Sequence, residues 1–268
     1  MIRAVDDGAR LAAWMAEAGV AEVLVVSPHL DDAVFSLAGF LARGGLPLRR
    51  VLTVFTEAGP ATDPAHARAM GFADPAEEFA ARRREDETAM ARLGTAFAHL
   101  GLESGRLDGA AAGDLARGLL ERSVGGGRLV LLPLGAGAVL SPLRRLARRV
   151  MRRPSGCGVH GDHVWARDRL RDLLAGTGCL AGYYAEIPYQ WANSPRELAR
   201  LAGELIAGRV QEFALTPDVD AKIAAAADYA SQIASEFGAR PSFRRRTASI
   251  AERLYLPAPV PDHPPRGS

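Results

Sequence analysis

Residues 22–45, EVLVVSPHLDDAVFSLAGFLARGG, decide the fold. The first six of them, Glu22–Ser27, form a short apolar run that ends before Pro28, which predicts a buried strand. Apolar residues then recur at helical spacing from Asp31 to Arg43, and the two glycines that follow are a helix stop signal. A buried strand that turns directly into a helix is the repeating unit of an α/β protein.

The same alternation continues along the chain. We expect further strands at Arg49–Phe55, Ala96–Leu102, Arg128–Leu132, Leu180–Ile187 and, at a sheet edge, Val210–Leu215. Helices are expected at Pro75–Leu93, Leu115–Arg122, Asp162–Leu174, Arg196–Ala207 and Asp218–Phe237. The sequence therefore predicts one Rossmann-like domain, residues 1–256, with a mostly parallel sheet and helices on both faces. Residues 257–268 hold five of the 17 prolines and are expected to be a poorly ordered tail.

Composition narrows the class of protein. With 268 residues and 48% hydrophobic content, the chain can bury a sizeable core. A formal net charge of +2 does not indicate a nucleic-acid-binding surface. The two cysteines, Cys157 and Cys179, match no metal or disulfide pattern, so a reducing, cytoplasmic setting is expected. Neither a signal peptide nor an apolar run of the ~20 residues that a membrane helix needs is found.

A basic insertion interrupts the alternation at about residues 137–156. Its segment Val139–Arg153 contains six arginines and no acid, with apolar residues on one helical face. One interpretation is a solvated helix packed on the body of the protein. Alternatively, Arg144–Arg153 contacts an anionic substrate or a membrane surface.

The first chemical motif is Pro28-His29-Leu30-Asp31-Asp32, at the strand-to-helix turn. A zinc ion takes nitrogen or oxygen ligands at about 2.0–2.2 Å, and His29 and Asp32 could both reach one ion. Asp31 would then stand beside the metal, where a free carboxylate can accept a proton from water. The alternative is that one of the two aspartates only caps the helix.

The second motif is His160-Gly161-Asp162-His163, just before a predicted helix. With His29 and Asp32, His163 would complete three protein ligands and leave a coordination position open, the arrangement of catalytic sites. A protonated His160 could stabilise a developing oxyanion, and Asp162 could orient that ring. Surface histidines beside a capping Asp162 are the alternative. Both motifs follow strands of one predicted parallel sheet, where ligands bind beyond the carboxyl ends.

These motifs resemble those of the PIG-L/LmbE-like family of zinc-dependent N-deacetylases. PHLDDA at 28–33 is similar to the family's AHPDDE, and HGDH at 160–163 is similar to HPDH. Three further matches lie in the stretches at 82–94 (an R-x-x-E…LG helix), at 186–189 (an acid-x-Pro-Tyr) and at 222–232. The resemblance covers roughly residues 20 to 255, and SPHLDDAVFSLAG resembles a branch found in bacterial secondary metabolism.

The resemblance implies a function for each matched residue. His29, Asp32 and His163 would hold Zn²⁺, although Fe²⁺ or another divalent metal also suits such ligands. Asp31 would be the general base, and His160 with Asp162 would stabilise the oxyanion. Arg82 and, by a looser match, Asp108 would bind sugar hydroxyls; on its own, Arg82 reads as one arginine of a solvated helix face.

The implied activity is hydrolysis of an N-acyl amide, N-acetyl by resemblance, on an amino sugar or a sugar-containing metabolite. This sequence departs from the family pattern at Ala33, where the family has an acid, and at Gly161, where it has proline. Two alternatives stay open: an amidase for thiol conjugates or other amides, and a metal- or sugar-binding module without catalysis. A nucleotide-binding domain is excluded because no G-x-G-x-x-G follows the first strand. A homo-oligomer is possible.

Overall fold

In the computed structural model, residues 6–123, 127–135, 160–187, 189, 193–233 and 250–258 are described. They form a seven-stranded sheet with the order β3-β2-β1-β4-β5-β7-β6. The strands are β1 (Glu22–Ser27), β2 (Leu48–Glu57), β3 (Ala96–Glu103), β4 (Arg128–Pro133), β5 (Leu180–Tyr184), β6 (Val210–Leu215) and β7 (Glu252–Pro257). The first five run parallel, whereas β7 pairs antiparallel with both β5 and β6. This confirms the predicted Rossmann-like α/β fold.

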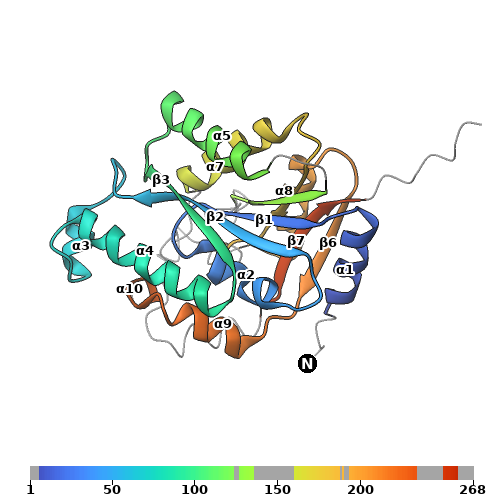
Figure 1. Cartoon of the computed structure of the whole chain (residues 1–268), viewed down its shortest axis with the longest axis horizontal. Helices are drawn as coiled ribbons and strands as arrows, with labels where there is room; N and C mark the ends of the chain where they lie inside the picture. Colours follow the sequence, from blue (N-terminus) through green and yellow to red (C-terminus); the bar gives the residue numbers. More distant parts are fainter. Residues whose placement is uncertain are drawn as a thin grey trace, which may run out of the picture.

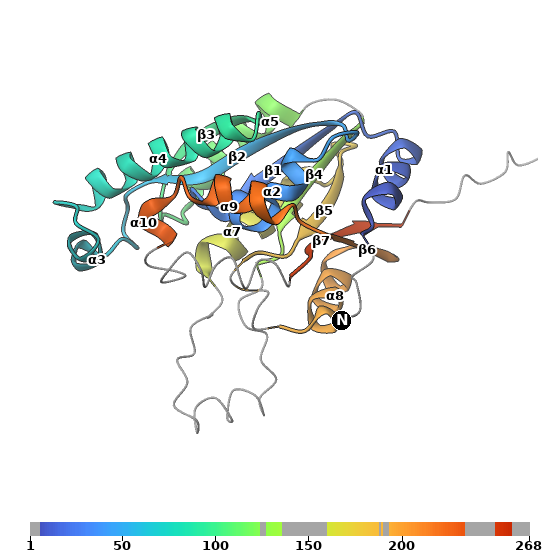
Figure 2. The ribbon, with the colours of Figure 1, turned by 90° about the horizontal axis from the view of Figure 1, so that it is seen from below.

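Helices cover both faces of the sheet (Figure 1). On one face lie α5 (Gly109–Ser123), α7 (Gly161–Leu174) and α8 (Pro195–Leu205). The other face is covered by α1 (Gly8–Glu17), α2 (Asp32–Ala42), α4 (Pro75–Arg92), α9 (Val219–Ala226) and α10 (Ala230–Gln232). Figure 2 shows α2 and α9 in front of the strands, and the short α3 (Pro64–Ala69) beside the start of α4. No helix in the described part of the chain is long and apolar enough to cross a membrane.

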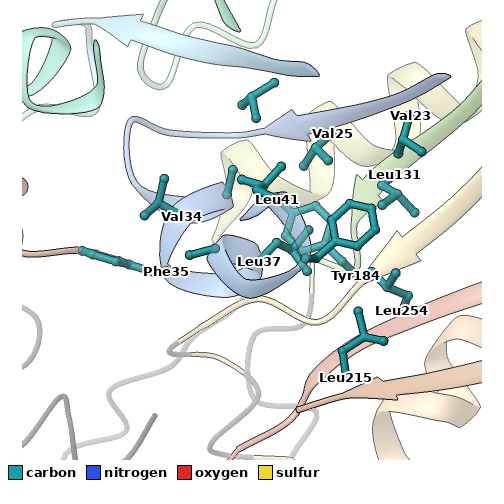
Figure 3. Close-up of a cluster of buried hydrophobic side chains, with 14 of the residues drawn as sticks. Val23, Val25, Val34, Phe35, Leu37, Leu41, Leu131, Tyr184, Leu215 and Leu254 are labelled. Carbon is teal, nitrogen blue, oxygen red and sulfur yellow. The ribbon is translucent and has the colours of Figure 1, made fainter. Parts of the chain in front are cut away.

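The two hydrophobic cores explain why the central strands read as continuous apolar runs. Along β1, Val23 and Val25 point into the cluster under α2, whereas Leu24 and Val26 point into the cluster under α7. This alternation follows from the two-residue period of a strand, and both faces are covered, so every position is apolar. Figure 3 shows the first cluster, where strand residues meet α2 side chains such as Leu37.

Local sequence signals set the starts of α4 and α8. Asp74 accepts a hydrogen bond from the Glu77 amide at 2.9 Å, and Pro75 follows it as the first residue of α4. Ser194 and Glu197 form a reciprocal capping box at the start of α8. Both patterns satisfy backbone N–H groups that a helix start leaves without partners.

The structure corrects several expected elements. The strand β7 and the helix α1 were not predicted, and the expected helix Asp218–Phe237 divides into α9 and α10, with residues from 234 to 249 outside the described part. The strand expected at Leu180–Ile187 ends at Tyr184. The basic insertion at 137–156, the segment Arg144–Arg153 and most of the tail lie outside the described residues.

Candidate active site

The first motif forms a tight turn between β1 and α2. The Ser27 hydroxyl donates to the His29 carbonyl oxygen at 2.7 Å and accepts from the Ala33 amide at 3.0 Å. Asp31 occupies the N-cap position of α2, yet its side chain makes no capping hydrogen bond. The Asp32 carboxylate accepts from the backbone N–H of His29 at 2.9 Å. Helix capping therefore does not account for the Asp31 carboxylate.

The second motif meets the first because β1 and β4 are parallel neighbours in the sheet. Gly161 begins α7, and His160 occupies its N-cap position without a side-chain capping bond. The His29 ring centroid lies 4.8 Å from that of His160 and 5.0 Å from that of His163. Two turns that are far apart in the chain thus bring three imidazoles together.

Three ligand atoms form a compact triangle at this point. His29 Nδ1 lies 3.1 Å from His163 Nε2, and Asp32 Oδ2 lies 3.5 Å and 3.4 Å from these two nitrogens. Ligands about 2.0–2.2 Å from a tetrahedral ion stand roughly 3.3–3.6 Å apart, so this donor set fits a divalent metal. The imidazoles of His29, His160 and His163 form a wider group, with ligand atoms within 4.8 Å of one another. The tighter triangle contains Asp32 in place of His160, so His160 would stand beside a bound ion without being one of these three ligands.

Asp162 contacts the ring nitrogen of His29 that lies outside the triangle. Its Oδ2 lies 3.1 Å from His29 Nε2 and also accepts from the Ser104 hydroxyl at 3.0 Å and the Gly105 amide at 3.2 Å. This differs from the expectation that Asp162 would orient His160, because the hydrogen bonds of this carboxylate go to His29 and the loop after β3. With Nε2–H donated to Asp162, the neutral His29 ring that a metal requires would present Nδ1 as its lone-pair atom.

Glu186 supports His163 in the same way from the opposite side. Its Oε1 lies 2.6 Å from His163 Nδ1, and its Oε2 accepts from the Gly135 amide at 2.7 Å. The side chain of Glu186 is fully buried. Donation of Nδ1–H to Glu186 leaves Nε2 of His163 as the lone-pair atom, which is the nitrogen in the triangle. The two carboxylates therefore select opposite tautomers in the two rings.

The electrostatics of the cluster depend on these contacts. Burial disfavours a charged His29 imidazole, but hydrogen bonds to Asp162 and Asp32 outweigh this and raise the pKa of His29 to about 9. Burial would raise the pKa of Asp32, yet the charges of His163 and His29 lower it to about 2. Burial and the two neighbouring imidazoles lower the pKa of His160 to about 4. In the metal-free cluster these contacts favour the neutral form of His160 at pH 7.

A pocket of about 300 Å³ lies against the cluster. The Arg82 guanidinium lines it and reaches the Asp31 carboxylate, with Nη2 at 3.4 Å from Oδ2. The Arg82 side chain is only 12% exposed, so the interpretation as a solvated helix-face residue is wrong. The side chains that complete the lining come from the loops after β2 and β3, from α3, α4 and α7, and from the segments after β5 and α9. They include Thr62, Glu78, Phe79, Ser104, Ile187, Tyr189 and Gln232.

Asp108 does not lie in this pocket. Its carboxylate caps α5 by accepting from the Ala111 amide at 2.9 Å and pairs with Arg106, and it is absent from the lining residues. Of the two departures from the family pattern, Ala33 lies in the hydrophobic core at 1% exposure and also does not line the pocket. A side chain at Gly161 would meet no atom within 4 Å, so space does not require glycine there.

Sequence reasoning missed the contacts of several side chains that complete the site. The 186–189 stretch was matched to the family, but nothing in it indicated that Glu186 would bind His163 or that the Tyr189 ring would lie 5.1 Å from the His163 ring. Ser104 follows a predicted strand that carries no motif. Its bond to Asp162 depends on how β3 ends beside the second motif, which no local pattern indicates.

Comparison with known proteins finds a deacetylase that is similar in sequence. No family model matches the chain. The sequence is 29% identical to 2'-N-acetylparomamine deacetylase from Streptomyces fradiae over 273 residues, which covers 88% of this chain and 90% of that protein. The chain is thus similar to an amino-sugar N-deacetylase over most of its length.

Solved structures of two deacetylases share the fold of this chain. The A40926 pseudoaglycone deacetylase superposes with a TM-score of 0.61 at 24% identity, covering 88% of this chain and 96% of its own. The zinc-inhibited form of teicoplanin deacetylase gives a TM-score of 0.61 at 21% identity, covering 90% and 100%. This chain therefore has the same fold as these two proteins over nearly their whole length.

Proposed function

We propose that this protein is a metal-dependent N-deacetylase that hydrolyses the N-acetyl group of an amino sugar and releases the free amine. The observation that carries the proposal is the triangle of His29, Asp32 and His163, with Asp31 beside it at the wall of an open pocket. The Streptomyces fradiae relative, an N-acetylparomamine deacetylase, supports an acetylated amino sugar as the substrate class.

The three triangle residues would hold the metal, and zinc is our first candidate because two imidazoles and one carboxylate suit it. A bound zinc ion supplies a Lewis acid for the amide carbonyl and lowers the pKa of water in its coordination sphere. Asp162 and Glu186 would hold His29 and His163 in the tautomers that face the ion.

The remaining residues would move protons and stabilise charge. Asp31 accepts a proton from the attacking water as the new C–O bond forms, and then gives a proton to the amide nitrogen as the C–N bond breaks. Acetate and the free amine are the products. His160, a neutral imidazole beside the triangle, donates a ring N–H to the carbonyl oxygen as it becomes negative. Arg82, near Asp31, would bind sugar hydroxyls on the pocket wall.

The experiment combines metal analysis with product detection. Purified protein is expected to bind about one equivalent of zinc with high affinity, and to deacetylate an N-acetylated amino sugar, detected by mass spectrometry, only when the metal is present. His163→Ala should lose the metal and the activity together. Metal-bound wild-type protein that leaves a panel of N-acetylated amino sugars intact would refute the proposal, as would full activity after complete metal removal.

A further inference from the structure

A buried carboxylate on the pocket wall has no part in the reaction proposed above. Glu78, in the first turn of α4, lines the pocket and is only 4% exposed. No residue in the described part of the chain gives its carboxylate a hydrogen bond. The nearest cationic atoms are Arg82 Nη1 and His66 Nε2, each 3.9 Å from Oε1. A carboxylate removed from water normally has close hydrogen-bonding partners. The Glu78 carboxylate can therefore accept a hydrogen bond from a bound ligand.

The charges on this wall do not balance. Arg82 is the cation between two carboxylates, and its closer contact, at 3.4 Å, is with Asp31 rather than Glu78. His66 is about half exposed, and its ring stays beyond hydrogen-bond distance of Glu78. Asp63 adds a third acid to the same wall, where its carboxylate caps α3. The wall formed by α3 and α4 is therefore short of positive charge.

Two residues of α4, Glu78 and Arg82, offer different polar groups to the pocket. Glu78 and Arg82 are one helical turn apart on the same face, and the Arg82 guanidinium lies over the Phe79 ring at 5.2 Å. Arg82 supplies donors to the pocket, whereas Glu78 supplies an acceptor with full negative charge. A hydroxyl group would satisfy the hydrogen-bonding capacity of Glu78 but not its charge, whereas an ammonium group would satisfy both.

We infer that Glu78 binds a protonated amino group of the substrate, distinct from the acetylated nitrogen. The substrate class is then an oligoamine sugar: one N-acetyl group at the metal cluster and at least one free amine at the α3–α4 wall. This inference rests on the proposed deacetylase function, since it takes the pocket to be the sugar site. Glu78 is a specificity-determining residue in this view, with no role in bond cleavage.

The test uses two N-acetylated disaccharides that differ in one substituent of the second ring, a free amine or a hydroxyl. Wild-type enzyme should prefer the amine, and added salt should reduce that preference because it screens the ion pair. Glu78→Gln keeps the shape and removes the charge, so it should lower kcat/KM for the amine substrate at least about tenfold more than for the hydroxyl substrate, mainly through KM.

The matched control is Glu77→Gln. Glu77 is the neighbouring acid, exposed to solvent, and its carboxylate accepts from the Ala73 amide at 2.7 Å, a bond that the glutamine oxygen can keep. We expect it to leave the substrate preference unchanged. Equal losses on both disaccharides in Glu78→Gln, or no loss on either, would overturn the inference.

A binding measurement separates this inference from the proposed function. The fully deacetylated disaccharide with two amines is titrated into wild-type, Glu78→Gln and Glu77→Gln proteins by calorimetry. Weaker binding only in Glu78→Gln supports the amine site even if no substrate is hydrolysed. Equal binding by all three proteins refutes the amine site even if deacetylation is observed.

Discussion

Replacing Glu186 by glutamine should weaken metal binding while leaving the fold intact. In the native protein one carboxylate accepts from two N–H donors, the Nδ1–H of His163 at 2.6 Å and the amide of Gly135 at 2.7 Å. Glutamine has a single side-chain oxygen, so its NH₂ group must face one of these donors. If it faces Gly135, a buried backbone N–H loses its partner, at a cost of about 1–3 kcal/mol.

If the NH₂ group faces His163 instead, the ring must change tautomer. Nδ1 then accepts from the glutamine, and Nε2 carries the proton at the position where the metal would bind. Either outcome opposes metal binding, so we expect zinc affinity to fall about 10–100-fold, which corresponds to about 1.4–2.8 kcal/mol. The cost of the lost hydrogen bond, about 1–3 kcal/mol, and the cost expected for losing a carboxylate that orients a metal-binding histidine, about 1.4–2.8 kcal/mol, are therefore similar.

The assay is a competition titration of zinc against a chromophoric chelator. The matched control is Glu204→Gln on α8, where the glutamate is 56% exposed and pairs only with Arg200 one turn away. Thermal unfolding of each metal-free protein shows whether the variants fold. Zinc affinity of Glu186→Gln within about twofold of wild type, in a folded protein, would refute the idea that this carboxylate selects the tautomer.

Two further predictions follow from other contacts. Asp31→Ala should keep stoichiometric metal but lose about 10²–10³ in kcat, because the proposed mechanism uses this carboxylate as a proton acceptor and not as a ligand. Near-normal turnover, measured with the metal-loaded variant, would exclude this role. Lys222→Met should destabilise the protein by about 3–5 kcal/mol in urea unfolding, because Lys222 Nζ lies 2.8 Å from Glu252 in a fully buried pair and its loss leaves an uncompensated charge. The double variant with Glu252→Gln removes the unpaired charge and keeps one acceptor oxygen for the Gly39 and Phe40 amides, so it should recover stability over Lys222→Met. Equal stability of Lys222→Met and wild type would contradict the reasoning.

That buried pair also explains why β7 was not predicted from the sequence. The strand begins at Glu252, whose carboxylate accepts from the Gly39 and Phe40 amides and from Lys222. The strand is only six residues long, begins with a charged residue and ends with a proline. An apolar pattern therefore does not predict it. Its antiparallel place between β5 and β6 depends on tertiary contacts rather than on chain order.

The division of the expected Asp218–Phe237 helix has a similar cause. Alanine-rich sequence favours a continuous helix, but Tyr229 adopts φ −91° and ψ 61° between α9 and α10. Its hydroxyl donates to the buried Asp86 carboxylate at 2.5 Å, and Ser231 donates to Glu85 from both its amide and its hydroxyl. Contacts with α4 thus override local propensity, and they bring the end of this segment to the pocket.

The sequence predicts which residue types form the site but not which side chains hydrogen-bond to one another. The spacing of the two motifs indicated which side chains could meet a metal, because histidine and aspartate at strand ends have few other uses in such numbers. The partner of Asp162 was expected to be His160, a neighbour in sequence, whereas the structure gives it His29. Partners across the fold depend on which strands are adjacent, and single-sequence patterns do not specify that order.

The strand order explains why motifs 134 residues apart form one site. The chain leaves β1 and β4 at the same edge of the sheet, but α2 then packs on one face and α7 on the other. The N-terminal ends of α2 and α7 therefore reach the pocket from opposite faces of the sheet, and their partial positive charge favours Asp31, Asp32 and Asp162. It follows that the triangle depends on the register between β1 and β4. A substitution that shifts this pairing would separate the ligands even with both motifs intact.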